Sequence, residues 1–384
     1  MRFEFATSAK IIFGPGTLKE VGEIAGKTGD KALLVTGKGG ASQERLVAIL
    51  ADNKVAWELV EAAGEPTIEA VEKAITVARQ ANCDFVISFG GGSVIDTGKA
   101  ISAMMTNSGS LLDYLEVVGG GKSILKLAAP LIAIPTTAGT GSEVSRNAVL
   151  TVPERKMKVS MRSPLMIARV ALVDPELTYS LPPAVTASTG MDALAQVIEP
   201  FVSRKSNLLT DIYCLEGMKR AARSILMAYT NGNDPQARLD MAFASLLGGL
   251  ALANAGLGGV HGFASPIGGM FEAPHGAVCA RLLPLVVQTN VNAIRERESG
   301  SQILSRYLEV ARIITGNPSA TIEDGTSFLE GLIEKLNIPP LSGYGIKRSD
   351  IPVLVENAAV ASSMQANPIQ LSKTELSQIL EKAL

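Results

Sequence analysis

The first half of the chain alternates short apolar runs with stretches in which apolar residues recur at helical spacing. Residues 67–79 show the helical spacing, and a weaker alternation at 54–60 predicts a strand. The apolar runs typical of buried strands cover residues 32–36, 84–89 and 131–134. Because strands that are apolar on both faces are typical of parallel sheets covered by helices, this order of elements predicts an α/β domain.

The second half of the chain has a different pattern. Pro175, Pro182 and Pro183 interrupt it, and the segments that follow are rich in Ala and Leu and poor in β-branched runs. Long helices are predicted at 186–201, 208–228, 238–254 and 320–336. We therefore place a domain boundary near Leu181, with an α/β domain at 1–180 and an all-helical domain at 181–384.

Composition and charge narrow the class of protein. The 384 residues carry 35 Lys and Arg against 37 Asp and Glu, a net charge of −2, and 47% of them are hydrophobic. Such a chain is not disordered, and it offers no electrostatic reason to bind nucleic acid or acidic membranes. The N-terminal sequence MRFEFATSAK lacks the apolar core of a secretory signal, so we expect a cytoplasmic protein. Its three cysteines are too sparse for a disulfide framework, and we expect each to be a small core residue.

Residues 241–271 contain no charged side chain and are numerous enough to cross a membrane. The same segment contains eight glycines together with Pro266 and His261, which weaken a membrane-spanning helix. We therefore expect a buried helix that runs into a glycine-rich loop, and no membrane partner.

Two loops that follow predicted strands are suited to binding phosphate. Residues 90–93, Gly-Gly-Gly-Ser, come before a predicted helix that Ser93 is expected to cap, and glycines there let a ligand approach the backbone closely. Alone, this motif fits a plain strand-to-helix turn equally well. A second loop, residues 135–143, is dense in hydroxyls and glycines, and open α/β sheets bind ligands at such loops. The loop at 37–42 has Ser42 in place of the third glycine of a dinucleotide fingerprint, so we expect a nucleotide site of another kind.

A second group of residues suggests a metal site. The chain has only two histidines, His261 and His275, and both lie in the glycine-rich region. Asp192 and Gln196, four residues apart, share one face of a helix expected to begin after Ser188-Thr189. A carboxylate and two imidazoles are a suitable ligand set for Zn²⁺ or Fe²⁺ with one position left open. Two alternatives remain. Asp192 would lie in the first turn of its helix only because the helix dipole stabilises a carboxylate there, and the two histidines would be ordinary core residues.

Taken together, the motifs resemble those of the iron-containing (group III) alcohol dehydrogenases, in the right order and over nearly the whole chain. They are FGPG at 13–16, GGGS at 90–93 with Asp96 and Lys99, PTTAGTGSEV at 135–144, GMDAL at 190–194, His261-Gly262, and Pro274-His275-Gly276. The resemblance implies a dehydroquinate-synthase-like architecture, with a dinucleotide-binding domain at 1–180, a metal- and substrate-binding helical domain at 181–384, and the site in the cleft between them. It also implies an NAD(P)-linked, metal-dependent enzyme that transfers hydride between the nicotinamide and a small alcohol or aldehyde, in a homo-oligomer of two or more chains.

The resemblance assigns roles residue by residue. Asp192, His261 and His275 match three of the family's metal ligands and are the expected catalytic residues. The expected cofactor-binding residues are Gly91, Gly92 and Ser93 for the pyrophosphate, Asp96 beside them, Thr136, Thr137 and Thr140 around the nicotinamide and its phosphates, and Lys158 for the ribose.

Three positions depart from the family pattern. Gln196 stands where the family usually has a fourth ligand, His, so metal binding should be weaker or less strict; we keep Gln196 as a candidate ligand. Ser265 stands where the family often has a further His, so a proton relay there would use a hydroxyl and water. Gly37, followed by Lys38, stands where an Asp commonly binds the adenosine ribose. Without that carboxylate a 2′-phosphate is not repelled, so we expect NADP to be accepted, and our hypothesis is that it is preferred.

Other functions of the same superfamily fit some of these features. A metal-independent reductase resembling maleylacetate reductase would explain Gln196. A synthase or lyase resembling dehydroquinate synthase would recycle NAD within one turnover. A binding protein without catalysis is the remaining alternative, and the survival of both phosphate loops and three ligands together disfavours it.

Overall fold

The computed structural model describes residues 2–62 and 64–384, and these form two compact units. The α/β unit contains residues 6–137 and 141–179, and the helical unit contains residues 180–384 together with 138–140 and the start of the chain. The predicted fold class is confirmed, because the first unit is built on a parallel sheet and the second on helices.

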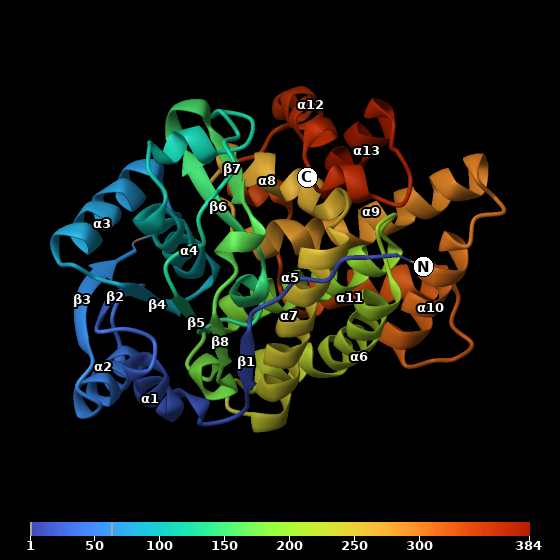
Figure 1. Ribbon diagram of the computed structural model, residues 1–384. Coiled ribbons are helices and arrows are strands. Elements are labelled where there is room, and N and C mark those ends of the chain that lie inside the picture. The colour runs from blue at the N-terminus through green and yellow to red at the C-terminus, as the bar shows by residue number, and fades with distance from the viewer. Residues whose placement is uncertain (1, 63) are drawn as a thin grey trace. The chain divides into compact units, whose positions relative to one another are not determined.

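The α/β unit is built on a six-stranded parallel sheet in the order β1-β8-β5-β4-β2-β3 (Figure 1). Its strands are β1 (Lys10–Phe13), β2 (Lys31–Thr36), β3 (Ala56–Glu61), β4 (Phe85–Gly90), β5 (Leu131–Pro135) and β8 (Val170–Val173). Its helices are α1 (Val21–Gly26), α2 (Ala41–Asp52), α3 (Ile68–Gln80) and α4 (Gly92–Thr106). A separate antiparallel pair joins β6 (Asn147–Val152) to β7 (Met157–Arg162).

Helices cover both faces of this sheet, which explains the uninterrupted apolar runs. In β2, Leu33 and Val35 belong to the hydrophobic core that includes residues of α3 and α4, whereas Ala32 and Leu34 belong to the core that includes residues of α1 and α2. Successive side chains of a strand point to opposite faces, so both faces must be apolar. Figure 1 shows the two helix pairs on either side of the strands.

The order of the strands determines where a ligand can bind in this unit. The chain leaves β2 toward β3 at one edge and then returns to form β4 on the other side of β2. Pairing places Thr36 opposite Phe89 and Gly90 opposite Pro135, so the loops that follow β2, β4 and β5 emerge side by side. Such a reversal is the usual ligand site of an open α/β sheet.

The helical unit packs nine α-helices around one apolar core, counted over its described residues. They are α5 (Pro183–Val202), α6 (Leu208–Thr230), α7 (Pro235–Ala255), α8 (Gly259–Met270), α9 (His275–Arg297), α10 (Ile303–Thr315), α11 (Ile322–Lys335), α12 (Ile351–Val360) and α13 (Lys373–Ala383). Several begin with side-chain caps typical of stable helices: Asn207 caps α6 and Asp234 caps α7.

Helix α5 begins earlier than the sequence pattern indicated. It starts at Pro183, because proline at the first helical position has a suitable φ and loses no hydrogen bond. The expectation that it begins after Ser188-Thr189 is therefore wrong. Asp192 lies in the third turn and is buried, so a role as a first-turn dipole residue is also excluded.

The uncharged segment 241–271 forms two helices rather than a helix and a loop. Helices α7 and α8 meet at a bend of 98° at Gly256–Gly258, and both are largely buried in the helical unit. Among the described residues, α9 is the one unbroken helix that is long and apolar enough to cross a membrane. Of its most apolar 18-residue stretch, 72% is buried inside the protein.

Candidate metal centre and nucleotide loops

Four potential ligands from three helices converge in the helical unit. Asp192 comes from α5, His261 from α8, and His275 and Cys279 from α9. Their ligand atoms all lie within 4.8 Å of one another. The Asp192 Oδ1 atom is 3.2 Å from Nε2 of His261 and 3.7 Å from Nε2 of His275. The three ligands predicted from the sequence therefore lie together, and a cysteine joins them.

Close helix packing brings these side chains together. His275 is the first residue of α9, and Cys279 follows one turn later on the same face. A Cβ atom on Gly276 would lie 2.1 Å from the Ser188 carbonyl oxygen, so only glycine allows the first turn of α9 to pack this tightly on α5.

The spacing of the ligand atoms fits a bound cation. Tetrahedral coordination with bonds of about 2.0–2.3 Å places ligand atoms about 3.3–3.7 Å apart. The measured separations from Asp192 to the two imidazoles, 3.2 and 3.7 Å, agree with this range within a tenth of an ångström. Oxygen, nitrogen and sulfur donors together suit a first-row divalent ion such as Zn²⁺ or Fe²⁺.

Glu199 fixes the orientation of His261. Its Oε2 lies 2.6 Å from Nδ1 of His261, and its Oε1 accepts a hydrogen bond of 2.6 Å from the Val260 N–H at the start of α8. Since a carboxylate accepts the proton of Nδ1, Nε2 is the nitrogen that faces the other ligands, and a bound metal would take the place of any proton on it. Glu199 thus satisfies a free N–H at the beginning of α8 and holds the imidazole in the tautomer that binds metal.

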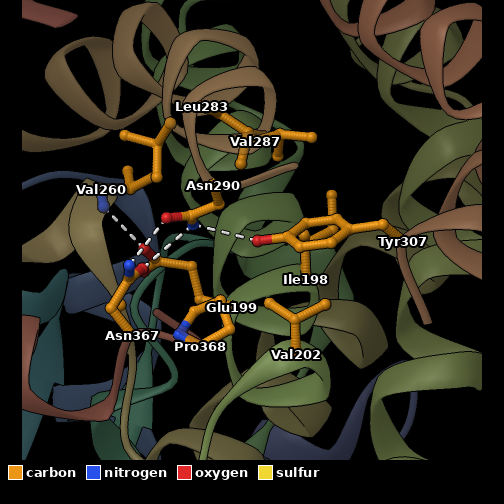
Figure 2. A pocket seen from close by; sticks show the side chains of 12 residues that line it. Ile198, Glu199, Val202, Val260, Leu283, Val287, Asn290, Tyr307, Asn367 and Pro368 are labelled. Atoms are coloured by element: carbon orange, nitrogen blue, oxygen red, sulfur yellow. Dashed lines mark hydrogen bonds between the residues drawn. The ribbon is translucent and has the colours of Figure 1, made fainter. Parts of the chain in front are cut away.

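A buried polar network lines the same small cavity as Glu199. The Asn367 Oδ1 accepts hydrogen bonds from the Gly259 N–H and the Asn290 side-chain amide, and Asn290 also donates to the hydroxyl of Tyr307. Figure 2 shows these side chains around a cavity of about 10 Å³, close to the space that one water needs. Burial raises the pKa of Tyr307, which therefore stays neutral.

The charges within the cluster shift the pKa values of Asp192 and of both histidines. Burial alone would raise the pKa of Asp192, but the charge of His275 and the hydrogen bond with His261 outweigh it and lower that pKa. Burial opposes protonation of His261, yet the charges of Cys279 and Glu199 raise the pKa of His261 well above its usual value. The pKa of His275 is also raised, against burial, by Cys279 and Asp192. A cluster that raises the pKa values of both imidazoles and lowers that of Asp192 favours positive charge at its centre.

Gln196, the fourth ligand considered from the sequence, is held by a loop of the same unit. Its Nε2 donates a hydrogen bond of 2.9 Å to the Gly139 carbonyl oxygen. Since a carbonyl accepts, the amide nitrogen must point to the loop, and only the amide oxygen remains for a cation. Ser265 lies one turn beyond His261 on α8 and is half-buried.

The sequence prediction missed Cys279 and Glu199. Cys279 was expected to be a core residue, and it is fully buried, but its sulfur faces the two imidazoles. The available signal was its position one helical turn after His275. Glu199 lies seven residues after Asp192, on the same face of α5, which is the corresponding signal there.

The α/β unit presents two helix N-termini suited to phosphate. Helix α4 begins at Gly92 with Gly91 as its N-cap, and α2 begins at Ala41 with Gly40 as its N-cap. Glycine has no side chain to cap a helix, so the N–H groups at both starts can bind an anion. Ser93 lies inside α4, so the expectation that it caps this helix is wrong. The Thr36 hydroxyl, buried at the end of β2, has no hydrogen-bond partner among the described residues.

The remaining predicted cofactor residues differ in their surroundings. Asp96 accepts hydrogen bonds from the Ser142 hydroxyl and the Val149 N–H and pairs with the buried Lys99, so it anchors the loop that follows β5. Thr136 donates its N–H to the Gly90 carbonyl, and Thr137 lies beside Gly91. Thr140 belongs to the segment 138–140 of the helical unit. Lys158, in β7, forms an ion pair with Glu65 at 3.0 Å.

The loop after β2 carries no negative charge at the position that departs from the family pattern. Gly37 directly follows β2, and Lys38 beside it is exposed. A Cβ atom on Gly37 would lie 3.7 Å from Val94, an ordinary van der Waals contact. Packing therefore does not require glycine here.

Comparison with known proteins identifies the family. A model described as iron-containing alcohol dehydrogenase matches residues 8–175, and one described as its C-terminal region matches residues 186–384. The chain is 36% identical to alcohol dehydrogenase 4 of Saccharomyces cerevisiae over 97% of its length and 96% of the relative's. It is 34% identical to the NAD-dependent methanol dehydrogenase of Bacillus methanolicus over 97% of each chain.

A solved structure described as 1,3-propanediol oxidoreductase superposes with a TM-score of 0.93 over the whole of both chains, at 31% identity. The protein belongs to the iron-containing alcohol dehydrogenase family. It is an oxidoreductase, a metal-dependent alcohol dehydrogenase linked to a nicotinamide cofactor.

Proposed function

We propose that the enzyme transfers hydride reversibly between the nicotinamide and a small alcohol or aldehyde, at a divalent ion, Fe²⁺ or Zn²⁺, held by Asp192, His261 and His275. The convergence of these three side chains from separate helices carries the proposal. When bound, such an ion acts as a Lewis acid that stabilises negative charge developing on the substrate oxygen.

The residues of the chain hold this centre in place and tune its charge. Asp192 supplies a buried negative charge with a lowered pKa, so it is ionised at neutral pH. Glu199 accepts the Nδ1 proton of His261 and so directs Nε2 at the centre. Ser265, one turn beyond His261, is the hydroxyl through which a proton would leave by way of water.

For the cofactor we propose binding at the N-termini of α2 and α4, with NADP preferred. The helix starts and glycine loops bind the pyrophosphate through backbone N–H groups. Packing leaves room for a Cβ atom at Gly37, so packing is not the reason for glycine there. Without a carboxylate at this position a 2′-phosphate is not repelled, and the exposed Lys38 would pair with it.

One experiment tests this function directly. A panel of short alcohols and aldehydes is assayed with NAD and with NADP on enzyme whose metal content has been measured. We expect turnover that follows metal content and is lost on chelation. Full activity without metal would instead indicate a metal-independent reductase, and product formation with no net change in nicotinamide absorbance would indicate a synthase or lyase.

A further inference from the structure

We propose that the thiolate of Cys279 is itself a ligand of the metal, taking the place that Gln196 leaves. The inference deepens the proposed function and rests on it, because it concerns the same centre. It assigns to this chain a ligand set of one carboxylate, two imidazoles and one thiolate, all within 4.8 Å of one another.

The position of the sulfur carries the inference. The Cys279 Sγ atom lies 3.8 Å from Nε2 of His261 and 3.6 Å from Nε2 of His275. A sulfur and a nitrogen bound to one tetrahedral ion, at about 2.3 and 2.05 Å, would be about 3.6 Å apart. The thiol therefore lies as far from each imidazole as a shared ion requires.

No stronger ligand than the Cys279 sulfur comes from Gln196, the other candidate for the fourth coordination position. The amide of Gln196 is tied by its nitrogen to the Gly139 carbonyl, so it offers at most a neutral oxygen. A thiolate is a stronger ligand than an amide oxygen for zinc, cobalt or ferrous iron. On coordination the S–H proton leaves to solvent and a bond from sulfur to the metal forms, with no change in oxidation state.

The thiolate would change the charge of the centre. Asp192 and a thiolate together contribute two negative charges, which balance a divalent ion, whereas Asp192 alone would leave one positive charge. We therefore expect the site to select metal by the softness of sulfur and to retain zinc or cobalt more tightly than manganese or magnesium.

Cobalt substitution tests the inference with a readout that does not depend on activity. We expect Co²⁺-loaded enzyme to show the intense near-ultraviolet absorption of sulfur-to-cobalt charge transfer. Cys279→Ser should lose this band and bind cobalt more than about tenfold more weakly, by analogy with the loss of outer-shell partners. Cys214→Ser is the matched control, because Cys214 is equally buried in the same unit but lies on α6, and it should keep the band and the affinity.

A measurement on unchanged protein covers the case in which Cys279→Ser does not fold. X-ray absorption of the zinc-loaded enzyme should show one sulfur at about 2.3 Å besides nitrogen and oxygen near 2.0–2.1 Å. Zinc or cobalt bound with no sulfur neighbour would overturn the Cys279 assignment and leave the metal-dependent function intact. No specific binding of either ion to enzyme that turns over alcohol would refute the proposed metal centre itself.

Discussion

The Nδ1 atom of His261, in the first turn of α8, lies 2.6 Å from the Oε2 atom of Glu199 on α5, and this contact joins the two helices beside the candidate metal centre. The other oxygen of Glu199 accepts the Val260 N–H, so the carboxylate also lies at the positive end of the helix dipole. The contact with Nδ1 leaves Nε2 as the nitrogen that faces the centre. Glu199 is therefore a positioning residue rather than a ligand.

Glu199→Gln should weaken metal binding by about 10- to 100-fold, because the charge that fixes the tautomer is lost while the shape is kept. The affinity is measured by competition with a chelator. Since the chain contains only two histidines, ¹⁵N-histidine spectra resolve the tautomer of each ring directly. We expect the His261 ring to lose its single tautomer in this variant.

The control for that variant is Tyr307→Phe, which removes a hydroxyl that is bonded to Asn290 and lines the same cavity as Glu199. It should lower stability by about 1 kcal/mol and leave metal affinity unchanged. If Glu199→Gln bound metal as tightly as the native enzyme, with unchanged imidazole spectra, Glu199 would have only a packing role.

Asp192→Asn and His275→Ala should each remove the bound metal and lower kcat/KM by about 10³-fold or more, the scale typical of losing a key electrostatic group. Metal is measured by elemental analysis of the purified variants. Asp324→Asn serves as control, because Asp324 is an exposed helix-capping carboxylate of the same unit. Either variant reducing aldehydes at the native rate without metal would exclude the Lewis-acid role.

The residues of the candidate metal centre differ in how far the sequence predicts them. With only His261 and His275 in the chain, few imidazole sites are possible, and Asp192 lies in a recognisable motif. Cys279 and Glu199 lie beside the imidazoles only because α5, α8 and α9 pack closely, and no local pattern shows which helix faces will meet. Their helical spacing from His275 and Asp192 limits the candidates without identifying them.

In the fold, too, local sequence patterns predict some elements, whereas others depend on tertiary packing. The strands β2, β4 and β5 were predicted to within a residue because both of their faces must be apolar. Helix α8 was predicted as a loop, since Gly259, Gly262, Gly268 and Gly269 all disfavour a helix. Burial of its apolar face overrides this propensity. Glycine also lets α8 pack closely on Met364, since a Cβ atom at Gly262 would lie 2.8 Å from that side chain.

Gly37→Asp should shift nucleotide preference toward NAD. A carboxylate there can accept hydrogen bonds from the adenosine ribose and repels a 2′-phosphate. A Cβ atom at this position would lie 3.7 Å from Val94, an ordinary van der Waals contact. We expect the ratio of kcat/KM for NADP to that for NAD to fall by about tenfold or more, equivalent to about 1.4 kcal/mol.

Lys38→Ala tests the second half of the same hypothesis. It should reduce kcat/KM with NADP by up to about tenfold and leave kcat/KM with NAD unchanged, because only the 2′-phosphate would pair with Lys38. An enzyme that used NAD as well as or better than NADP before any substitution would contradict the proposed preference.

Glu143, in the loop after β5, should make the α/β unit less stable as the pH rises. Its carboxyl is buried, and burial raises its pKa from 4.5 to about 7, against the opposing charge of Lys99. At pH 4 and below, the carboxyl is protonated in both the folded and the unfolded state and has no effect. Between about pH 4.5 and 7 the unfolded state loses the proton first, so stability falls by about 3 kcal/mol and then stays level.

Glu143→Gln removes this titration, so the variant should gain up to about 3 kcal/mol at pH 8 and almost nothing at pH 4. The single tryptophan, Trp57 in β3, reports unfolding of the α/β unit by fluorescence in urea. Glu154→Gln is a suitable control, because Glu154 is exposed in the same unit and should not alter the pH profile. Equal gains for Glu143→Gln at pH 4 and pH 8 would show that folding leaves the pKa of Glu143 unchanged, because neighbouring groups offset the effect of its burial.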